Sequence, residues 1–201
     1  MMRGWSLTLA CALFTFLTLT LILRSPKSES QIDLPLNAVS EISEPDMLKM
    51  QAGLTALEGE GVIIEMDDGN RAANTDENPN LYVIHDDDVL RVVNELRAAG
   101  AEAVSINGQR LIETSEIRCA GPTLSVNNVR SAAPFIISAI GDKVALENAI
   151  EMRGGVRQTL SVWGIRIEVK PSDEIYIPPF DGTRRFTHAQ PTRKKKFFTS
   201  N

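Results

Sequence analysis

The polar side chains with the greatest capacity for specific recognition gather between residues 107 and 118. Arginine pairs with a carboxylate through two parallel N–H bonds, and asparagine and glutamine offer both donors and acceptors. We therefore expect a surface that recognises a partner or ligand. The alternative is that these groups satisfy one another inside an irregular sheet. The candidate recognition residues are Asn107, Gln109, Arg110, Thr114 and Arg118.

The two arginines of this cluster stand in different local patterns. Arg110 directly follows an Asn-Gly-Gln turn, whereas Arg118 lies between Ile117 and Cys119 in an alternating strand pattern. We therefore expect Arg110 to be accessible to a partner, and Arg118 to be the more structural of the two.

Cys119 and two acidic stretches are the other places where the residue types could do chemistry. A nucleophilic thiolate needs a nearby base, and both histidines, His85 and His188, are distant from Cys119 in sequence. We expect Cys119 to be a small buried apolar residue. The run His85-Asp-Asp-Asp88 precedes a helix, where acids cap free N–H groups. The acidic stretch 67–77 lacks the ligand spacing of an EF-hand, so we expect no metal there. The sequence offers no recognisable pair of nucleophile and base, so we expect no enzymatic activity and no cofactor.

The elements that must position these residues show both helical and strand periodicity. Apolar residues from Val89 to Ala99 predict a helix that ends at Gly100. Alternation from Ala103 predicts a strand, and Asn107-Gly108 predicts a hairpin turn because both residues tolerate positive φ. This order of elements predicts an α+β fold, a ferredoxin-like sandwich with extra strands. A second helix is predicted after Asp142, and further strands at 61–66, 117–119, 123–126, 134–140, 160–163, 165–169 and 175–177.

Four segments are predicted along the chain: an anchor (1–24), a linker (25–42), a globular domain (43–180) and a basic disordered tail (181–201). Trp5–Leu23 holds nineteen residues without a charge, enough to cross a bilayer core of about 30 Å. No small-residue cleavage site follows it. We therefore expect an uncleaved, single-pass transmembrane helix in the cell membrane, with the globular domain outside the cytoplasm.

The start of the globular domain carries a narrow apolar stripe. Ser43 is a capping residue, and Met47, Met50, Leu54 and Leu57 follow at helical spacing. A stripe this short favours a helix packed on the domain over a coiled coil that pairs two chains. Dimerisation stays open on this evidence.

The formal net charge of -5 conceals an asymmetry. Residues 41–180 hold 23 acidic and 12 basic side chains, whereas residues 181–201 hold one acidic and six basic side chains. An acidic domain with a basic tail is not typical of nucleic-acid binding, which places basic charge on the fold itself. The tail has two interpretations: a solubilising segment, or a contact with anionic lipid headgroups or an acidic partner.

Several runs of this sequence resemble the YlxW-like family of bacterial membrane-anchored proteins, which contain a domain of unknown function. The resemblance covers about residues 45–179, and its most specific part is Gly100–Arg110. It implies a cell-envelope role near cell division and supplies no catalytic residues. Family members typically carry a coiled coil after the anchor, and here only the short apolar stripe stands in that place. The runs are Leu57–Asp68, His85–Leu90, Asn94–Arg110 and Thr114–Gly121.

Together these features predict a membrane-tethered, non-enzymatic envelope domain that binds an envelope or division-associated protein. The alternative is a sensor that binds a small anionic ligand in a ferredoxin-like cleft lined by Arg110 and Arg118. A concave pocket would favour the sensor, and a flat exposed patch would favour protein binding.

Overall fold

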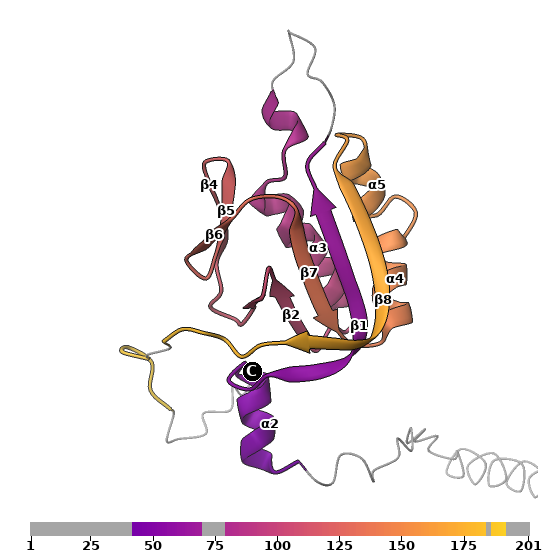
Figure 1. Cartoon of the computed structure of the whole chain (residues 1–201). Helices are drawn as coiled ribbons and strands as arrows, with labels where there is room; N and C mark the ends of the chain where they lie inside the picture. Colours follow the sequence, from indigo (N-terminus) through magenta and orange to yellow (C-terminus); the bar gives the residue numbers. More distant parts are fainter. Residues whose placement is uncertain (1–41, 70–78, 184–185, 192–201) are drawn as a thin grey trace, which may run out of the picture. The chain divides into compact units, whose positions relative to one another are not determined.

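The computed structural model describes residues 42–69, 79–183 and 186–191 (Figure 1). The chain divides into two compact units, Met1–Ile42 and Ser43–Asn201, and every described helix and strand belongs to the second. In chain order these elements are α2 (Glu44–Gln51), β1 (Leu57–Asp67), η1 (Pro79–Tyr82), α3 (Asp86–Ala98), β2 (Ala103–Ile106), β3 (Gln109–Arg110), β4 (Ile117–Ala120), β5 (Thr123–Val126), β6 (Val129–Ser131), β7 (Phe135–Ile140), α4 (Lys143–Glu151), α5 (Val156–Ser161) and β8 (Arg166–Ile177).

Two antiparallel sheets organise the domain, so the α+β class predicted from the sequence is confirmed. The larger sheet has the strand order β3-β2-β7-β1-β8, with β1 between β7 and β8. The smaller sheet has the order β4-β5-β6 and is inserted between β3 and β7 in the chain. β1 and β8 are the long strands (Figure 1). Their pairing shifts register between Gly59 and Gly61.

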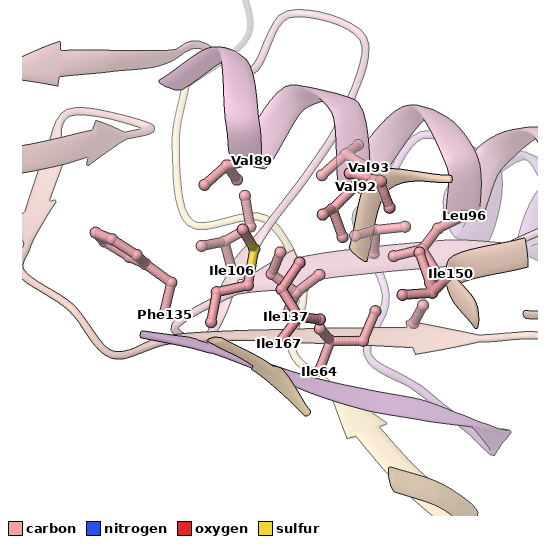
Figure 2. Close-up of a cluster of buried hydrophobic side chains, with 14 of the residues drawn as sticks. Ile64, Val89, Val92, Val93, Leu96, Ile106, Phe135, Ile137, Ile150 and Ile167 are labelled. Atoms are coloured by element: carbon pink, nitrogen blue, oxygen red, sulfur yellow. The ribbon is translucent and has the colours of Figure 1, made fainter. Parts of the chain in front are cut away.

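The buried faces of the strands and the apolar faces of the helices pack together in one main core. Val62, Ile64 and Met66 of β1 are fully buried, because alternate side chains of a strand point to the same face. Figure 2 shows the apolar face of α3 directed at side chains of the sheet. α4, α5 and the inner strand β5 contribute to the same core. The labelled members in Figure 2 are Ile64, Val89, Val92, Val93, Leu96, Ile106, Phe135, Ile137, Ile150 and Ile167.

The helix and turn signals of the sequence are confirmed at several positions. Asp142 Oδ1 accepts hydrogen bonds from the N–H groups of Val144 and Ala145 at 2.9 and 3.0 Å, which caps α4. The helix α3 ends at Ala98, two residues before Gly100. Gly100 has a φ of 93°, which residues with a side chain rarely adopt. Asn107 and Gly108 both have positive φ in the turn between β2 and β3.

The segment between α4 and β8 is where the sequence prediction was wrong. We expected a strand at 160–163, but residues 156–161 form α5. Val156 and Leu160 are buried four residues apart, which is a helical spacing that a short apolar run does not reveal. The expected strands at 165–169 and 175–177 belong to one strand, β8, and β6 was not predicted.

The predicted helix at the start of the domain forms, with Ser43 as its N-cap. None of its residues is buried, Met47 and Met50 are half-buried, and Leu48 is 61% exposed. Pairing of two chains through this stripe stays a prediction.

Several sequence-based expectations fall outside the described residues. Among the residues that the structure describes, no helix is both long enough and apolar enough to span a bilayer. The predicted anchor Trp5–Leu23, nearly all of the linker, and residues 192–201 of the basic tail lie outside that part of the chain.

Candidate functional site

The burial of the two candidate arginines is the reverse of what we expected. Arg110 pairs with Ser105 in the large sheet and is only 4% exposed, whereas Arg118 is exposed on β4. Gly53 lies beside the Arg110 side chain: a Cβ built on Gly53 would lie 3.8 Å from Arg110 Cγ, and also 3.8 Å from Phe180 Cβ. The Phe180 N–H donates to the Gly53 carbonyl at 2.8 Å, which holds Phe180 next to Gly53.

The Arg110 guanidinium is buried without a hydrogen-bond partner at Nε and Nη1. Burial lowers its pKa from the usual value, since desolvation disfavours the charged form. Asn127 lies against the same residue, and its Nδ2–H donates to the Arg110 carbonyl at 2.9 Å. The Asn127 Oδ1 atom is likewise buried without a partner.

The remaining candidate residues are distributed over separate elements. Asn107 Oδ1 accepts the Ile136 N–H at 2.7 Å, so this amide serves the start of β7. Gln109 is half-buried, and Thr114 is exposed. The structure brings Thr114 and Asn127 together at one cavity, whose lining does not include Arg118.

This cavity, which we call the Phe180 cavity, has a volume of about 450 Å³. One wall is formed by residues 180–183, which we had assigned largely to the tail. No periodicity marks those residues in the sequence, so only the apolar Phe180 itself could have signalled that the fold continues. The lining of the Phe180 cavity includes Thr114, Glu116, Asn127, Phe180, Asp181 and Thr183.

A second cavity of about 420 Å³ brings His85 and Cys119 to one site. Cys119 is exposed, contrary to our expectation of a buried residue. The thiol of this exposed residue is partly shielded from solvent at the cavity, and this desolvation raises its pKa. A hydrogen bond from the Asp86 N–H lowers the pKa, whereas the contact with the Asp86 carboxylate and the negative charges of Asp86 and Asp87 raise it. A raised pKa favours the thiol over the thiolate, which is the nucleophilic form of cysteine.

A third, shallower hollow of about 180 Å³ lies beside the start of α3, and we call it the Trp163 groove. Three apolar side chains line it while remaining exposed: Leu81 at 44%, Val83 at 38% and Trp163 at 44%. Asp87 and Arg91 also line it, with 3.4 Å between the Asp87 carboxylate and Arg91 Nη2. We had placed Trp163 in a strand, so this surface was not predicted.

Within the described residues, no three His, Cys, Asp or Glu side chains are grouped so that they could hold a metal ion.

Comparisons with known proteins place the domain in a family. Residues 44–190 match the family described as "Bacterial protein of unknown function (DUF881)". The UPF0749 protein YlxW of Bacillus subtilis (strain 168) is 34% identical over 143 residues, which cover 71% of this chain and 62% of that protein. The UPF0749 protein Rv1823 of Mycobacterium tuberculosis (strain ATCC 25618 / H37Rv) is 28% identical over 142 residues, or 66% of this chain and 46% of that protein. The chain thus spans less than two thirds of the length of either relative.

A solved structure is also similar. The crystal structure of an uncharacterized conserved protein from Mycobacterium tuberculosis matches with a TM-score of 0.61 and 26% sequence identity, over 75% of this chain and 100% of that chain. The resemblance to YlxW-like proteins noted in the sequence is confirmed, and the chain belongs to the DUF881 family of bacterial proteins of unknown function.

Proposed function

We propose that this chain is a membrane-tethered, non-enzymatic domain that binds an envelope or division-associated protein through the Trp163 groove. The observation that carries the proposal is the exposure of Leu81, Val83 and Trp163 around one hollow. Large apolar side chains gathered on a surface are typical of interaction sites, and tryptophan is enriched among residues that dominate binding energy.

The surroundings of the groove resemble the anatomy of a protein interface. Buried Leu160 contributes to its lining, and the Asp87–Arg91 pair supplies charged groups beside the apolar side chains. An apolar centre with a polar rim is the usual arrangement in such interfaces. The raised pKa of the Cys119 thiol supports a role without nucleophilic catalysis.

The experiment is a crosslinking pull-down from membranes with the full chain and its Trp163→Ala variant. We expect the variant to recover at least about tenfold less partner than the natural chain, because truncating a hot-spot residue of an interface costs about 2 kcal/mol or more. Tyr176→Ala is the matched control, since Tyr176 is an aromatic residue on β8 that is 59% exposed. Equal recovery with Trp163→Ala, or equal loss with Tyr176→Ala, would contradict the proposal.

The membrane tether is supported by the uncharged run Trp5–Leu23 and by the envelope role that the family resemblance implies. We propose a single-pass anchor with the domain outside the cytoplasm and the basic tail near anionic lipid headgroups. Mass spectrometry of the membrane fraction should find the N-terminal peptide attached to the domain. A soluble mature form that begins near Ser25 would refute the anchor.

We further infer that the large sheet is a variant of the ferredoxin-like fold. Its support is the connectivity: β1, α3, β2, β7, α4 and β8 follow the order strand-helix-strand-strand-helix-strand. The four strands lie in the order β2-β7-β1-β8, and each neighbouring pair is antiparallel. In this description β3 is an added edge strand, and β4–β6 are an insertion.

A second candidate function, the sensing of a small anionic ligand, is favoured by one specific observation. The guanidinium of Arg110 is buried without a partner at Nε and Nη1, and the carbonyl of the same residue accepts a hydrogen bond from Asn127, which lines the Phe180 cavity. The pocket lined by Arg110 and Arg118 that we expected for such a sensor is not formed by this cavity, since neither arginine belongs to its lining.

A further inference from the structure

Two hollows on the surface of the domain share part of their lining. One is the Trp163 groove, and the other is the cavity that contains Cys119, which we call the Cys119 cavity. Val83 and His85 line both of them. These two residues belong to the short segment between η1 and α3, so that segment forms a wall common to both hollows.

The Cys119 cavity continues the apolar surface of the Trp163 groove. Its volume of about 420 Å³ lies in the usual range of ligand sites, about 300–1,000 Å³, whereas the groove has only about 180 Å³. An occupant of the groove alone would leave the larger apolar hollow beside it open to water. The apolar residues that line the Cys119 cavity are Val83, Ile84, Pro122, Ala133 and Phe135.

The charged side chains along the two hollows are mostly acidic. Asp68 lines the Cys119 cavity, and Asp87 and Asp88 line the Trp163 groove. Among the described residues that line either hollow, Arg91 is the one arginine or lysine. The Asp87 side chain is 62% exposed, so its carboxylate can meet a second cation besides Arg91. Complementary charge therefore favours a basic partner segment over an acidic one.

We propose that the protein partner presents a segment with two bulky apolar side chains and a lysine or arginine between them. One apolar side chain fills the Trp163 groove, and the other enters the Cys119 cavity. The basic side chain passes over the common wall and lies near the Asp87 carboxylate. Bulky apolar anchors in neighbouring pockets are the usual source of affinity in such complexes. This inference rests on the proposed function above and names the chemistry of the partner.

The probe is the acetylated and amidated pentapeptide Lys-Phe-Lys-Leu-Lys, added to the full chain in phosphatidylcholine nanodiscs. Each hollow contains its own reporter. Trp163 reports on the groove by its fluorescence, in a Trp5→Phe background that removes the other tryptophan. Cys119 reports on its cavity by its rate of alkylation with iodoacetamide, followed by mass spectrometry. We expect the peptide to change the Trp163 emission and, at saturation, to slow the alkylation at least about tenfold, because the reaction depends on access to the thiol.

Comparison peptides and matched variants separate charge from shape. The peptide Glu-Phe-Glu-Leu-Glu should bind at least about tenfold more weakly, because it brings like charges together. The peptide Lys-Ser-Lys-Ser-Lys lacks apolar side chains and should affect neither reporter. Asp87→Asn should weaken binding of the first peptide several-fold, since it removes a carboxylate from the groove. Asp173→Asn is the matched control: its side chain is 88% exposed and belongs to neither lining, so binding should not change.

The outcomes separate the partner's chemistry from the proposed function. A change in the Trp163 emission without protection of Cys119 means that only one hollow is occupied, and it overturns the inference. Equal binding of Lys-Ser-Lys-Ser-Lys, which would show attraction by charge alone, overturns it as well, and so does the absence of any binding. In each of these cases the proposed function stands if partner recovery in the crosslinking pull-down still depends on Trp163. Equal recovery with Trp163→Ala overturns both.

Discussion

Cys119 and Asp86 are joined by two hydrogen bonds that run in opposite directions. The Cys119 N–H donates to Asp86 Oδ2 at 3.0 Å, and the Asp86 N–H donates to Cys119 Sγ at 3.4 Å. The pair ties β4 of the small sheet to the first residue of α3. Burial alone would raise the pKa of the Asp86 carboxyl, but the hydrogen bonds from Cys119 and from backbone N–H groups outweigh it and lower the pKa.

This relationship predicts how the reactivity of Cys119 responds to charge. Replacing Asp86 by Asn should lower the thiol pKa, because it removes the negative charge and the carboxylate contact that raise it. Each unit of pKa changes the thiolate fraction about tenfold at a pH below the pKa. We expect faster alkylation of Cys119 by iodoacetamide at pH 8, measured as modified Cys119 peptide by mass spectrometry.

Asp87→Asn is the control for this experiment. Asp87 adds negative charge near the thiol but makes no hydrogen bond to it, so its replacement should accelerate alkylation less. An alkylation rate for Asp86→Asn equal to or below that of the natural chain would refute the assigned cause.

Asp88, one turn into α3, has a pKa shifted in the opposite direction. Burial raises the pKa of its carboxyl, although the His85 N–H donates to Asp88 Oδ2 at 3.0 Å. A folded-state pKa above the unfolded value means that the folded protein binds the proton more tightly, so this contribution to stability falls as pH rises through the folded pKa. Asp88→Asn keeps an acceptor for the His85 N–H and removes the buried charge. We expect it to be neutral or stabilising, by at most about 1 kcal/mol, at pH 7.

Urea unfolding at pH 7 and at pH 4 measures this difference. The stabilisation by Asp88→Asn should shrink at pH 4, where the natural carboxyl is increasingly protonated. Asp87→Asn, at a side chain that is 62% exposed, should change stability by less than about 1 kcal/mol at either pH. A loss of stability by Asp88→Asn at pH 7 that exceeds its loss at pH 4 would contradict the sign argued for Asp88.

The sequence predicted the regular elements where local signals and tertiary packing agree. The turn at Asn107-Gly108, the helix that ends before Gly100 and the cap at Asp142 all have local causes, namely positive φ and side-chain acceptors. In contrast, α5 was misassigned because the six residues Val156–Ser161 are too few to reveal a helical period.

The candidate site was less predictable, because burial there depends on residues distant in the sequence. Arg110 follows a turn, which suggested exposure, but its side chain lies beside Gly53 and is buried. Cys119 and His85 are 34 positions apart in the chain, and only the packing of β4 against the start of α3 makes them line one cavity. Neither the burial of Arg110 nor the shared cavity of His85 and Cys119 could therefore be predicted from positions along the sequence.

Asn107 offers a separate test of whether a candidate recognition residue serves the fold. Its Oδ1 accepts the Ile136 N–H at 2.7 Å, and its φ is 46°. Asn107→Ala should cost about 1–3 kcal/mol, because it leaves a backbone donor without its partner and keeps a strained φ. Asn107→Gly should cost less, since glycine adopts positive φ without strain.

The free energies of unfolding of both variants are measured by urea denaturation, with Gln109→Ala as the control. Gln109 is half-buried and follows Gly108 in the same turn, and its replacement should change stability less than Asn107→Ala does. Equal stability of Asn107→Ala and the natural chain would show that the Ile136 bond contributes nothing, and the side chain would then be free to serve recognition.

The last prediction concerns Gly61, where β1 passes between β7 and β8. A Cβ built on Gly61 would lie 1.9 Å from the Ala139 carbonyl oxygen and 2.9 Å from its carbonyl carbon. Both atoms belong to the backbone of the central sheet, so no side chain can turn away to make room. Gly61→Ala should therefore cost more than about 3 kcal/mol of folding stability or prevent folding, as the most severe cases of steric overpacking do.

Gly100→Ala is the matched control, because a Cβ there meets no atom within 4 Å and only its φ of 93° is unfavourable. We expect that control to cost about 1–2 kcal/mol. Circular dichroism and urea unfolding of both variants decide the matter: a Gly61→Ala variant as stable as Gly100→Ala would mean that β1 and β7 can separate at Gly61 without loss of the sheet.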